Sequence, residues 1–131
     1  MTETNANKSG SLREARILVV EDNFLIATDI TQSLHRRGAV VLGPVPDLQS
    51  GLAIAKRDRP DAAVLDVSIV GGTSTPIAEA LLHSNCPYVF LTGYTSPGLA
   101  DEHLNRAAVL TKPVQPQDLV KTLYDMLQRH A

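Results

Sequence analysis

The sequence predicts an α/β domain in which a doubly wound parallel sheet of five strands is flanked by five helices. Five short runs are apolar throughout instead of alternating with polar residues, as in strands that are buried on both faces. Amphipathic segments separate these runs, and strict βα alternation implies right-handed crossovers with helices on both sides of the sheet. The runs are ILVV (17–20), AVVLG (39–43), AAVLD (62–66), YVFLT (88–92) and AAVLT (107–111).

Helical periodicity and capping residues mark the segments between the strands. The first expected helix carries one apolar face and ends in a cationic turn before Gly38. Its face contains Leu25, Ile26, Ile30, Ser33 and Leu34. The second helix is expected to begin at an Asp47 N-cap and to end before Pro60.

Prolines mark the starts of the remaining three helices. Pro76 suits the first position of a third helix that begins near Thr75. A short fourth helix is expected after Ser96-Pro97, and a fifth begins at Pro116. The fifth shows apolar residues at helical spacing, which predicts one buried face.

Length and composition predict one domain in a soluble, intracellular protein. The 131 residues suffice for a single core, with a polar tail at 1–15 and the folded domain at 16–131. Twelve basic and fourteen acidic residues give a net charge of −2, which predicts neither a nucleic-acid nor a membrane partner. A single cysteine, Cys86, excludes an internal disulfide, and no run resembles a membrane span or signal peptide. We therefore expect a cytoplasmic protein.

Polar side chains stand at the ends of the predicted strands. They are Glu21, Asp22, Asp66, Thr92 and Lys112. The carboxyl ends of parallel strands meet at one edge, where ligands of doubly wound sheets bind. Two carboxylates about 4 Å apart repel by on the order of 4 kcal/mol at an effective dielectric constant of about 20, so a cation must offset them. Mg²⁺ prefers such oxygen ligands and leaves positions for phosphate oxygens, which predicts a magnesium-assisted phosphoryl-transfer site.

These motifs resemble those of the response-regulator receiver domains (CheY-like) of bacterial two-component signalling, over about residues 16–130. Four motifs stand in the family's order at the ends of the expected strands. They are Glu21-Asp22, Asp66, Thr92-Gly93 and Lys112-Pro113. The resemblance implies a flavodoxin-like fold with strand order 2-1-3-4-5.

The resemblance also implies a role for each residue of the site. Glu21, Asp22 and Asp66 would hold Mg²⁺ together with the backbone carbonyl of Ser68. Asp66 would accept a phosphoryl group from a histidine kinase, and Thr92 and Lys112 would bind the phosphoryl oxygens. The expected protein is thus a single-domain response regulator without classical enzymatic turnover. It would signal by docking a downstream protein or by relay to a histidine phosphotransfer protein.

The segment Phe90–Tyr94 is similar to the Phe-Ala-Thr-Gly-type motif of an alphaproteobacterial single-domain subgroup. That subgroup is associated with kinases of the HWE/HisKA2 type. Many receivers carry a switching aromatic residue where this sequence has Val109. We expect Tyr94, two residues past Thr92, to serve as the switch instead.

These residues also allow other interpretations. Taken singly, Glu21 and Asp22 could begin a helix, Asp66 could form a turn, and Lys112 could be a solvated lysine. A dehalogenase-like phosphatase would need a second aspartate at Ser68, and neither a P-loop nor a dinucleotide-binding glycine motif is present. The alternative that stays open is a pseudo-receiver, a binding module that is not regulated by phosphorylation.

Overall fold

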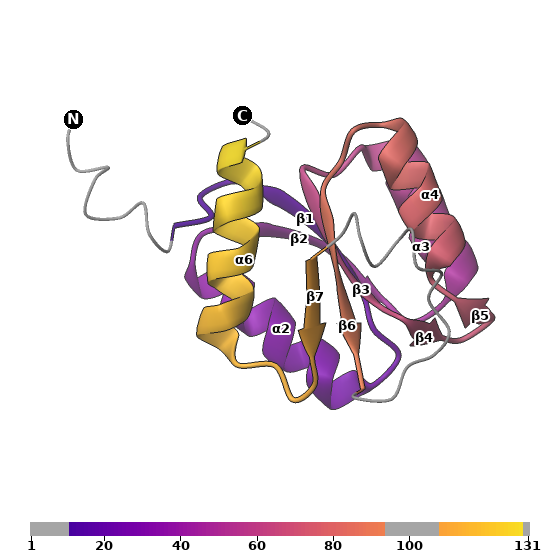
Figure 1. The fold of residues 1–131 in the computed structure, drawn as a ribbon, viewed down its shortest axis with the longest axis horizontal. Coiled ribbons are helices and arrows are strands. Elements are labelled where there is room, and N and C mark those ends of the chain that lie inside the picture. The colour runs from indigo at the N-terminus through magenta and orange to yellow at the C-terminus, as the bar shows by residue number, and fades with distance from the viewer. Residues whose placement is uncertain (1–10, 94–107, 130–131) are drawn as a thin grey trace.

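A five-stranded parallel sheet forms the centre of the molecule (Figure 1). The computed structural model describes residues 11–93 and 108–129. Within them the strand order is β2-β1-β3-β6-β7, which confirms the expected order 2-1-3-4-5. The strands are β1 (Arg16–Val20), β2 (Val40–Val45), β3 (Ala62–Asp66), β6 (Tyr88–Thr92) and β7 (Ala108–Thr111).

Helices cover both faces of the sheet (Figure 1). One face packs against α2 (Phe24–Arg36) and α6 (Pro116–Arg129), and the other against α3 (Leu48–Asp58) and α4 (Thr75–His83). The described residues thus contain four helices, and the helix expected after Ser96-Pro97 lies outside them. Among these four, none is both long and apolar enough to span a bilayer.

Strand β1 shows how the two faces are built. Ile17 and Val19 belong to the cluster beneath α2 and α6, whereas Leu18 and Val20 belong to the cluster beneath α3 and α4. Successive side chains of a strand point to opposite faces, and all four are 0% exposed. Burying each such side chain stabilises the fold by about 1.5–3 kcal/mol, which explains the unbroken apolar runs.

The helix boundaries follow the capping residues. Asp47 is the N-cap of α3, where its Oδ2 accepts a hydrogen bond from the Ser50 N–H at 2.9 Å, as expected. Helix α2 differs from the expectation, because Leu25 lies outside its buried face and is 73% exposed. The buried face is set by Ala27, Ile30 and Leu34, and Leu25 lies about 180° around the helix from Leu34.

The segment just before residue 16 contacts the domain. Leu12 is only 2% exposed and packs into the cluster beneath α2 and α6. Its N–H donates to the Arg37 carbonyl at 2.8 Å, and the Glu14 N–H donates to the Gly38 carbonyl at 2.7 Å. One large apolar side chain in a polar segment therefore suffices to anchor that segment to the end of α2.

An antiparallel hairpin that the sequence reading missed follows β3. Its strands are β4 (Ser68–Ile69) and β5 (Gly72–Thr73), joined by a two-residue turn. Gly71 has φ +98°, which favours glycine and was an available turn signal. The Val70 carbonyl accepts from the Leu48 N–H at 3.0 Å, so the hairpin is tied to the start of α3.

Candidate functional site

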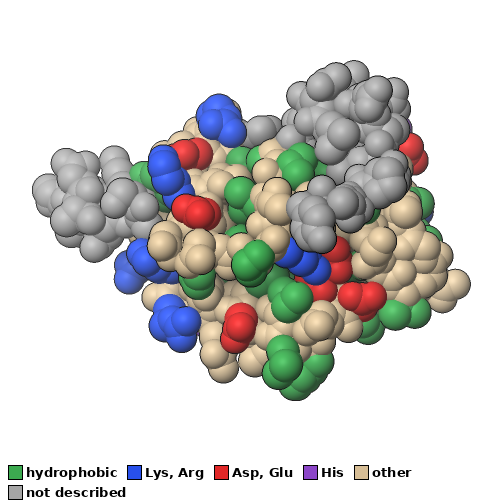
Figure 2. Space-filling model, turned by 60° about the horizontal axis from the view of Figure 1, so that its bottom comes forward, with side chains coloured by type: hydrophobic (Ala, Val, Ile, Leu, Met, Phe, Trp, Pro, Cys, Tyr) green, Lys and Arg blue, Asp and Glu red, His purple; other side chains and the backbone are tan. Residues whose placement is uncertain are grey.

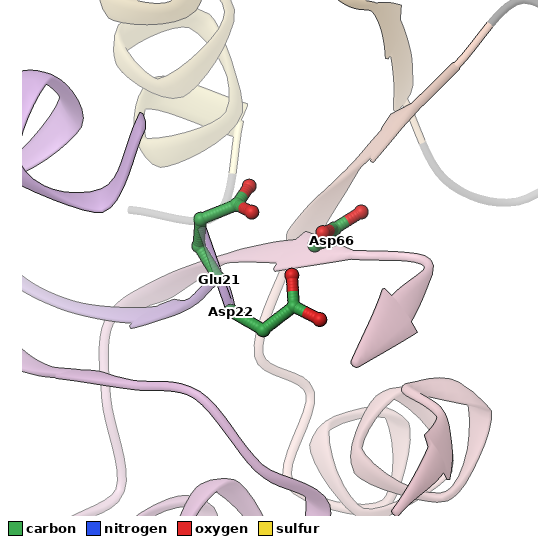
Figure 3. Close-up of side chains that lie close together, drawn as sticks. All are labelled: Glu21, Asp22 and Asp66. Carbon is green, nitrogen blue, oxygen red and sulfur yellow. The ribbon is translucent and has the colours of Figure 1, made fainter. Parts of the chain in front are cut away.

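Three carboxylates meet at the carboxyl edge of the sheet. Glu21 and Asp22 directly follow β1, and Asp66 is the last residue of β3. One oxygen from each lies within 4.8 Å of the others. Figure 3 shows the three side chains directed toward a common space from these two neighbouring strands. The structure therefore brings together the three acids that the sequence reading placed on one edge.

Strand register explains this convergence. β1 and β3 are parallel neighbours, and Val20 lies opposite Leu65. The next residue of each chain, Glu21 and Asp66, therefore leaves the sheet at the same level. The Glu21 N–H also donates to the Val45 carbonyl at 3.0 Å, which continues the pairing of β1 with β2 by one residue.

Glu21 is a buried acid, with only 2% of its surface exposed. Its Oε2 accepts from the Asn23 N–H at 3.1 Å and from the Lys112 Nζ at 3.3 Å. Its Oε1 lies 3.1 Å from the same Nζ, but no described group makes a hydrogen bond of good geometry to it. Among the described groups, Oε1 therefore has only the ion pair with the Lys112 ammonium, and it retains capacity to bind a further cation.

Lys112 contacts two of the acids from the end of β7. Its N–H donates to the Thr92 carbonyl at 2.8 Å, and its Nζ lies 3.2 Å from Asp66 Oδ2. Burial alone would lower the pKa of the Lys112 ammonium, but its contacts with Glu21 and Asp66 outweigh burial and raise that pKa. Lys112 therefore stays charged and partly neutralises the acids.

Asp66 is 6% exposed, and its environment disfavours the charged form. Burial, followed by the proximity of Glu21, raises the pKa of Asp66 to about 7 against the opposing effect of Lys112. One ammonium thus does not fully compensate two buried carboxylates. A divalent cation at this edge would supply the missing charge and favour the ionised form of Asp66.

The donor set fits a hard divalent cation. It comprises carboxylate oxygens from three residues, one of them exposed Asp22, which leaves the site open to solvent on that side. Mg²⁺ takes oxygen ligands of this kind and keeps several water ligands. Ser68 stands two residues beyond Asp66 in β4 and is exposed. Its backbone carbonyl as a fourth protein ligand remains a prediction.

Thr92 places a hydroxyl at the same edge. It ends β6, pairs with Thr111 of β7 and is 9% exposed. Its Oγ1 donates to the Gly93 carbonyl at 2.9 Å. A threonine side chain has a rotatable hydroxyl, so the same group can donate to an anion bound at Asp66. The expected switch residue, Tyr94, lies outside the described residues.

The sequence reading missed one residue that contacts the site, Asn23. Helix α2 begins at Phe24, so neither Glu21 nor Asp22 lies in its first turn, and Asn23 is the N-cap. Its Oδ1 accepts from the Ile26 N–H at 3.0 Å, while its own N–H donates to Glu21. An asparagine directly before a helical pattern is an N-cap signal and could have been found.

An apolar surface lies beside the acids. Phe24 and Leu25 are 79% and 73% exposed at the start of α2. A cavity of about 160 Å³ lies between α2 and the segment that follows β7. Its lining includes Lys112, Ile26, Ile30, Val114 and Leu119. Figure 2 shows red carboxylates beside a blue basic side chain, with green apolar side chains on the neighbouring surface.

Known proteins share this sequence pattern. The profile of the response regulator receiver domain matches residues 17–124. The transcriptional regulatory protein PdtaR of Mycobacterium tuberculosis is 26% identical over 82% of this chain and 54% of its own length. The phyllosphere-induced regulator PhyR of Methylorubrum extorquens is 28% identical over 79% of this chain and 40% of its own length. The chain therefore spans about half the length or less of these curated relatives.

Solved structures share the fold. A CheY-like receiver domain protein from Methanospirillum hungatei has a TM-score of 0.78 and 26% identity, covering 90% of this chain and 99% of its own. The response regulator PhyR from Brucella abortus has a TM-score of 0.81 and 24% identity, covering 98% of this chain and 54% of its own. The 28% identity to PhyR of Methylorubrum extorquens also fits the narrower subgroup resemblance. With these matches and the acidic edge of its sheet, the chain belongs to the response regulator receiver domain family of two-component signalling.

Proposed function

We propose that this receiver accepts a phosphoryl group on Asp66 from the phosphohistidine of a histidine kinase, with Mg²⁺ bound at the acidic edge. The observation that carries the proposal is the convergence of Glu21, Asp22 and Asp66 within 4.8 Å, with the Lys112 Nζ 3.2 Å from Asp66. Positioning and charge neutralisation are what phosphoryl transfer requires of a protein. The site offers both in one place.

The reaction transfers one phosphoryl group from the phosphohistidine to Asp66. A carboxylate oxygen of Asp66 attacks phosphorus, an O–P bond forms, and the N–P bond of the phosphohistidine breaks. The electron pair of that bond returns to the imidazole nitrogen, and Asp66 becomes an acyl phosphate. The Lys112 ammonium and the Thr92 hydroxyl bind the transferred phosphoryl oxygens, and bound Mg²⁺ supplies further charge neutralisation. The protein is modified by this reaction and is not a classical enzyme.

The exposed apolar pair at the start of α2 supports docking of the phosphodonor. Phe24 and Leu25 lie on the helix that begins two residues after the metal-binding acids. Large exposed apolar side chains close to a reactive group are typical of an interaction surface. We propose that the histidine-bearing protein packs against them while its phosphohistidine reaches Asp66. An HWE/HisKA2-type kinase and a histidine phosphotransfer protein are the candidate donors.

The output is a second part of the proposal. Movement of the Thr92 side chain from the Gly93 carbonyl toward the phosphoryl group would displace the end of β6. A phosphoryl group bound more tightly by one of two conformations shifts their populations. We propose that this shift, with Tyr94 as the switch residue, controls docking of a downstream protein or onward phosphotransfer.

Phosphorylation by a small donor tests the proposal without the cognate kinase. The protein is incubated with Mg²⁺ and acetyl phosphate, and the modified peptide is located by mass spectrometry after borohydride trapping of the acyl phosphate. We expect modification at Asp66 that disappears in Asp66→Asn and after chelation of the metal. Asp22→Asn should slow it strongly, and Asp118→Asn, an exposed acid in the first turn of α6, is the matched control. A protein that binds Mg²⁺ and remains unmodified would instead be a pseudo-receiver.

A further inference from the structure

Glu21 needs a fixed orientation if it is to serve the metal site, and Asn23 supplies one of its contacts. The carboxylate is buried, and its Oε2 is held by the Asn23 N–H at 3.1 Å. The other oxygen, Oε1, makes no hydrogen bond of good geometry to the described groups, although the Lys112 Nζ lies 3.1 Å from it. Holding Oε2 therefore fixes the orientation of the carboxylate toward the space that it shares with Asp22 and Asp66 (Figure 3).

Asn23 is itself fixed by α2. It adopts φ −87° and ψ 115°, the extended conformation of an N-cap. Its Oδ1 accepts from the Ile26 N–H at 3.0 Å, and its carbonyl accepts from the Ala27 N–H at 2.9 Å. These two contacts lock the backbone of Asn23 to the first turn of the helix. The same two hydrogen bonds therefore set the direction of the Asn23 N–H and of its hydrogen bond to Glu21.

This arrangement differs from an ordinary helix start. In a capping box, an acidic or amide side chain three residues after the N-cap accepts from the N-cap N–H. That position is Ile26 here, and the first turn of α2 contains no acid. Glu21, two residues before the cap, takes the N–H instead. The cap of α2 and a carboxylate of the metal site are thereby parts of one hydrogen-bonded unit.

We propose that Asn23 is a positioning residue that orients Glu21 for the divalent cation. This inference rests on the proposed function, in which Glu21 belongs to the magnesium site. Groups that hydrogen-bond to metal ligands typically contribute tenfold or more to metal affinity. Loss of the Asn23 side chain keeps the backbone N–H that binds Glu21, but it removes the Ile26 hydrogen bond that fixes the direction of that N–H. We therefore expect it to weaken Mg²⁺ binding although Asn23 is not itself a ligand.

An amide chemical-shift titration with MgCl₂ at constant ionic strength tests the inference. We expect Asn23→Ala to weaken Mg²⁺ binding about tenfold relative to the wild type. Asn23→Ser, which keeps an N-cap acceptor, should restore most of the affinity. Asn23→Gly tolerates the N-cap conformation without a side-chain acceptor, and should also bind Mg²⁺ more weakly if Asn23→Ala folds poorly.

Asp47→Ala is the matched control. Asp47 caps α3 through the same type of hydrogen bond, to the Ser50 N–H, and its carboxylate is not among the three that share the candidate metal site. Its loss should lower the melting temperature while leaving Mg²⁺ affinity within about twofold. Equal Mg²⁺ affinity in the wild type and Asn23→Gly would overturn the role of Asn23 but not the proposed function. The same holds if Asp47→Ala weakens Mg²⁺ binding as much as the Asn23 variants do. A wild-type spectrum that Mg²⁺ leaves unchanged would overturn the proposed function as well.

Discussion

Leu65 and Asp66 are neighbours in β3, and both are buried, at 0% and 6% exposure. Leu65 packs into the apolar cluster beneath α3 and α4. Asp66 meets another carboxylate and a lysine, and its pKa is raised to about 7. Within one residue, the strand thus passes from a position that stabilises the fold to one that costs folding free energy. The apolar interior of the sheet stabilises the fold, whereas its carboxyl edge carries charged groups that can bind a ligand.

The largest change in the free energy of unfolding is expected for a substitution in the interior of the sheet. Leu65→Ala should lower the free energy of unfolding by about 3 kcal/mol, because it removes buried apolar area and leaves a cavity. Urea denaturation measures the change. Val40→Ala, at a position that is 47% exposed on the edge strand β2, should cost under about 1 kcal/mol. Similar losses for the two variants would contradict the distinction between interior and edge.

At Asp66, in contrast, the ionised side chain lowers the stability of the fold, and protonation raises it. Its folded-state pKa lies above the usual value of 3.8, so proton binding stabilises the folded state. This contribution is fully present below about pH 4 and is lost as the pH rises through about 7. In metal-free protein, the free energy of unfolding should therefore fall by on the order of 2 kcal/mol between pH 5 and pH 8.

Two comparisons assign this pH dependence to Asp66. Asp66→Asn keeps the shape of the side chain without a titrating group, so its unfolding free energy should vary much less over the same pH range. Saturating Mg²⁺ should also reverse the trend in the wild type, since a cation binds the ionised carboxylate more tightly. An Asp66→Asn curve that falls as steeply as the wild-type curve would assign the effect to another group.

The smallest effect on stability is expected at the apolar surface beside the acids. Replacing Phe24 and Leu25 together by serine should change the free energy of unfolding by only about 0.5 kcal/mol, because both side chains are exposed. Phosphoryl transfer from a phosphorylated histidine kinase domain should slow about tenfold, while the rate with acetyl phosphate stays unchanged. Quench-flow with radiolabelled kinase measures the first rate.

Val40→Ser is the matched control for that surface. It also removes an exposed apolar side chain, but Val40 begins β2 and so lies at the amino edge of the sheet, away from the acids. It should leave both transfer rates unchanged. Equal slowing with the kinase and with acetyl phosphate would show that the serine variants disturb the chemistry and not the docking.

The strands and the acidic edge could be predicted because each depends on local sequence and one topological rule. Continuous apolar runs identified β3 and β6 to the residue. Parallel strands then had to present Glu21, Asp66, Thr92 and Lys112 at the same edge. β2 extends to Val45, beyond the expected run, because its Pro44 lies on an edge strand where a missing N–H is tolerated.

Contacts between distant segments could not be predicted in the same way. Leu12 is buried because the end of α2 happens to lie beside it, and a polar segment with one leucine gives no periodic signal. The exposure of Leu25, by contrast, could have been predicted from helical periodicity, because it lies about 180° around α2 from the buried Leu34. The contacts of Lys112 with both Glu21 and Asp66 depend on side-chain conformations that spacing does not specify.

The most direct measurement of the central claim is an NMR titration of the protein with Mg²⁺ and beryllofluoride, an analogue of the phosphoryl group. If Glu21, Asp22 and Asp66 hold one divalent cation for phosphoryl transfer to Asp66, amide shifts should appear around Asp66 and Thr92. They should require the metal and vanish in Asp66→Asn. A spectrum that remains unchanged with both ligands, or shifts that persist in Asp66→Asn, would contradict the account.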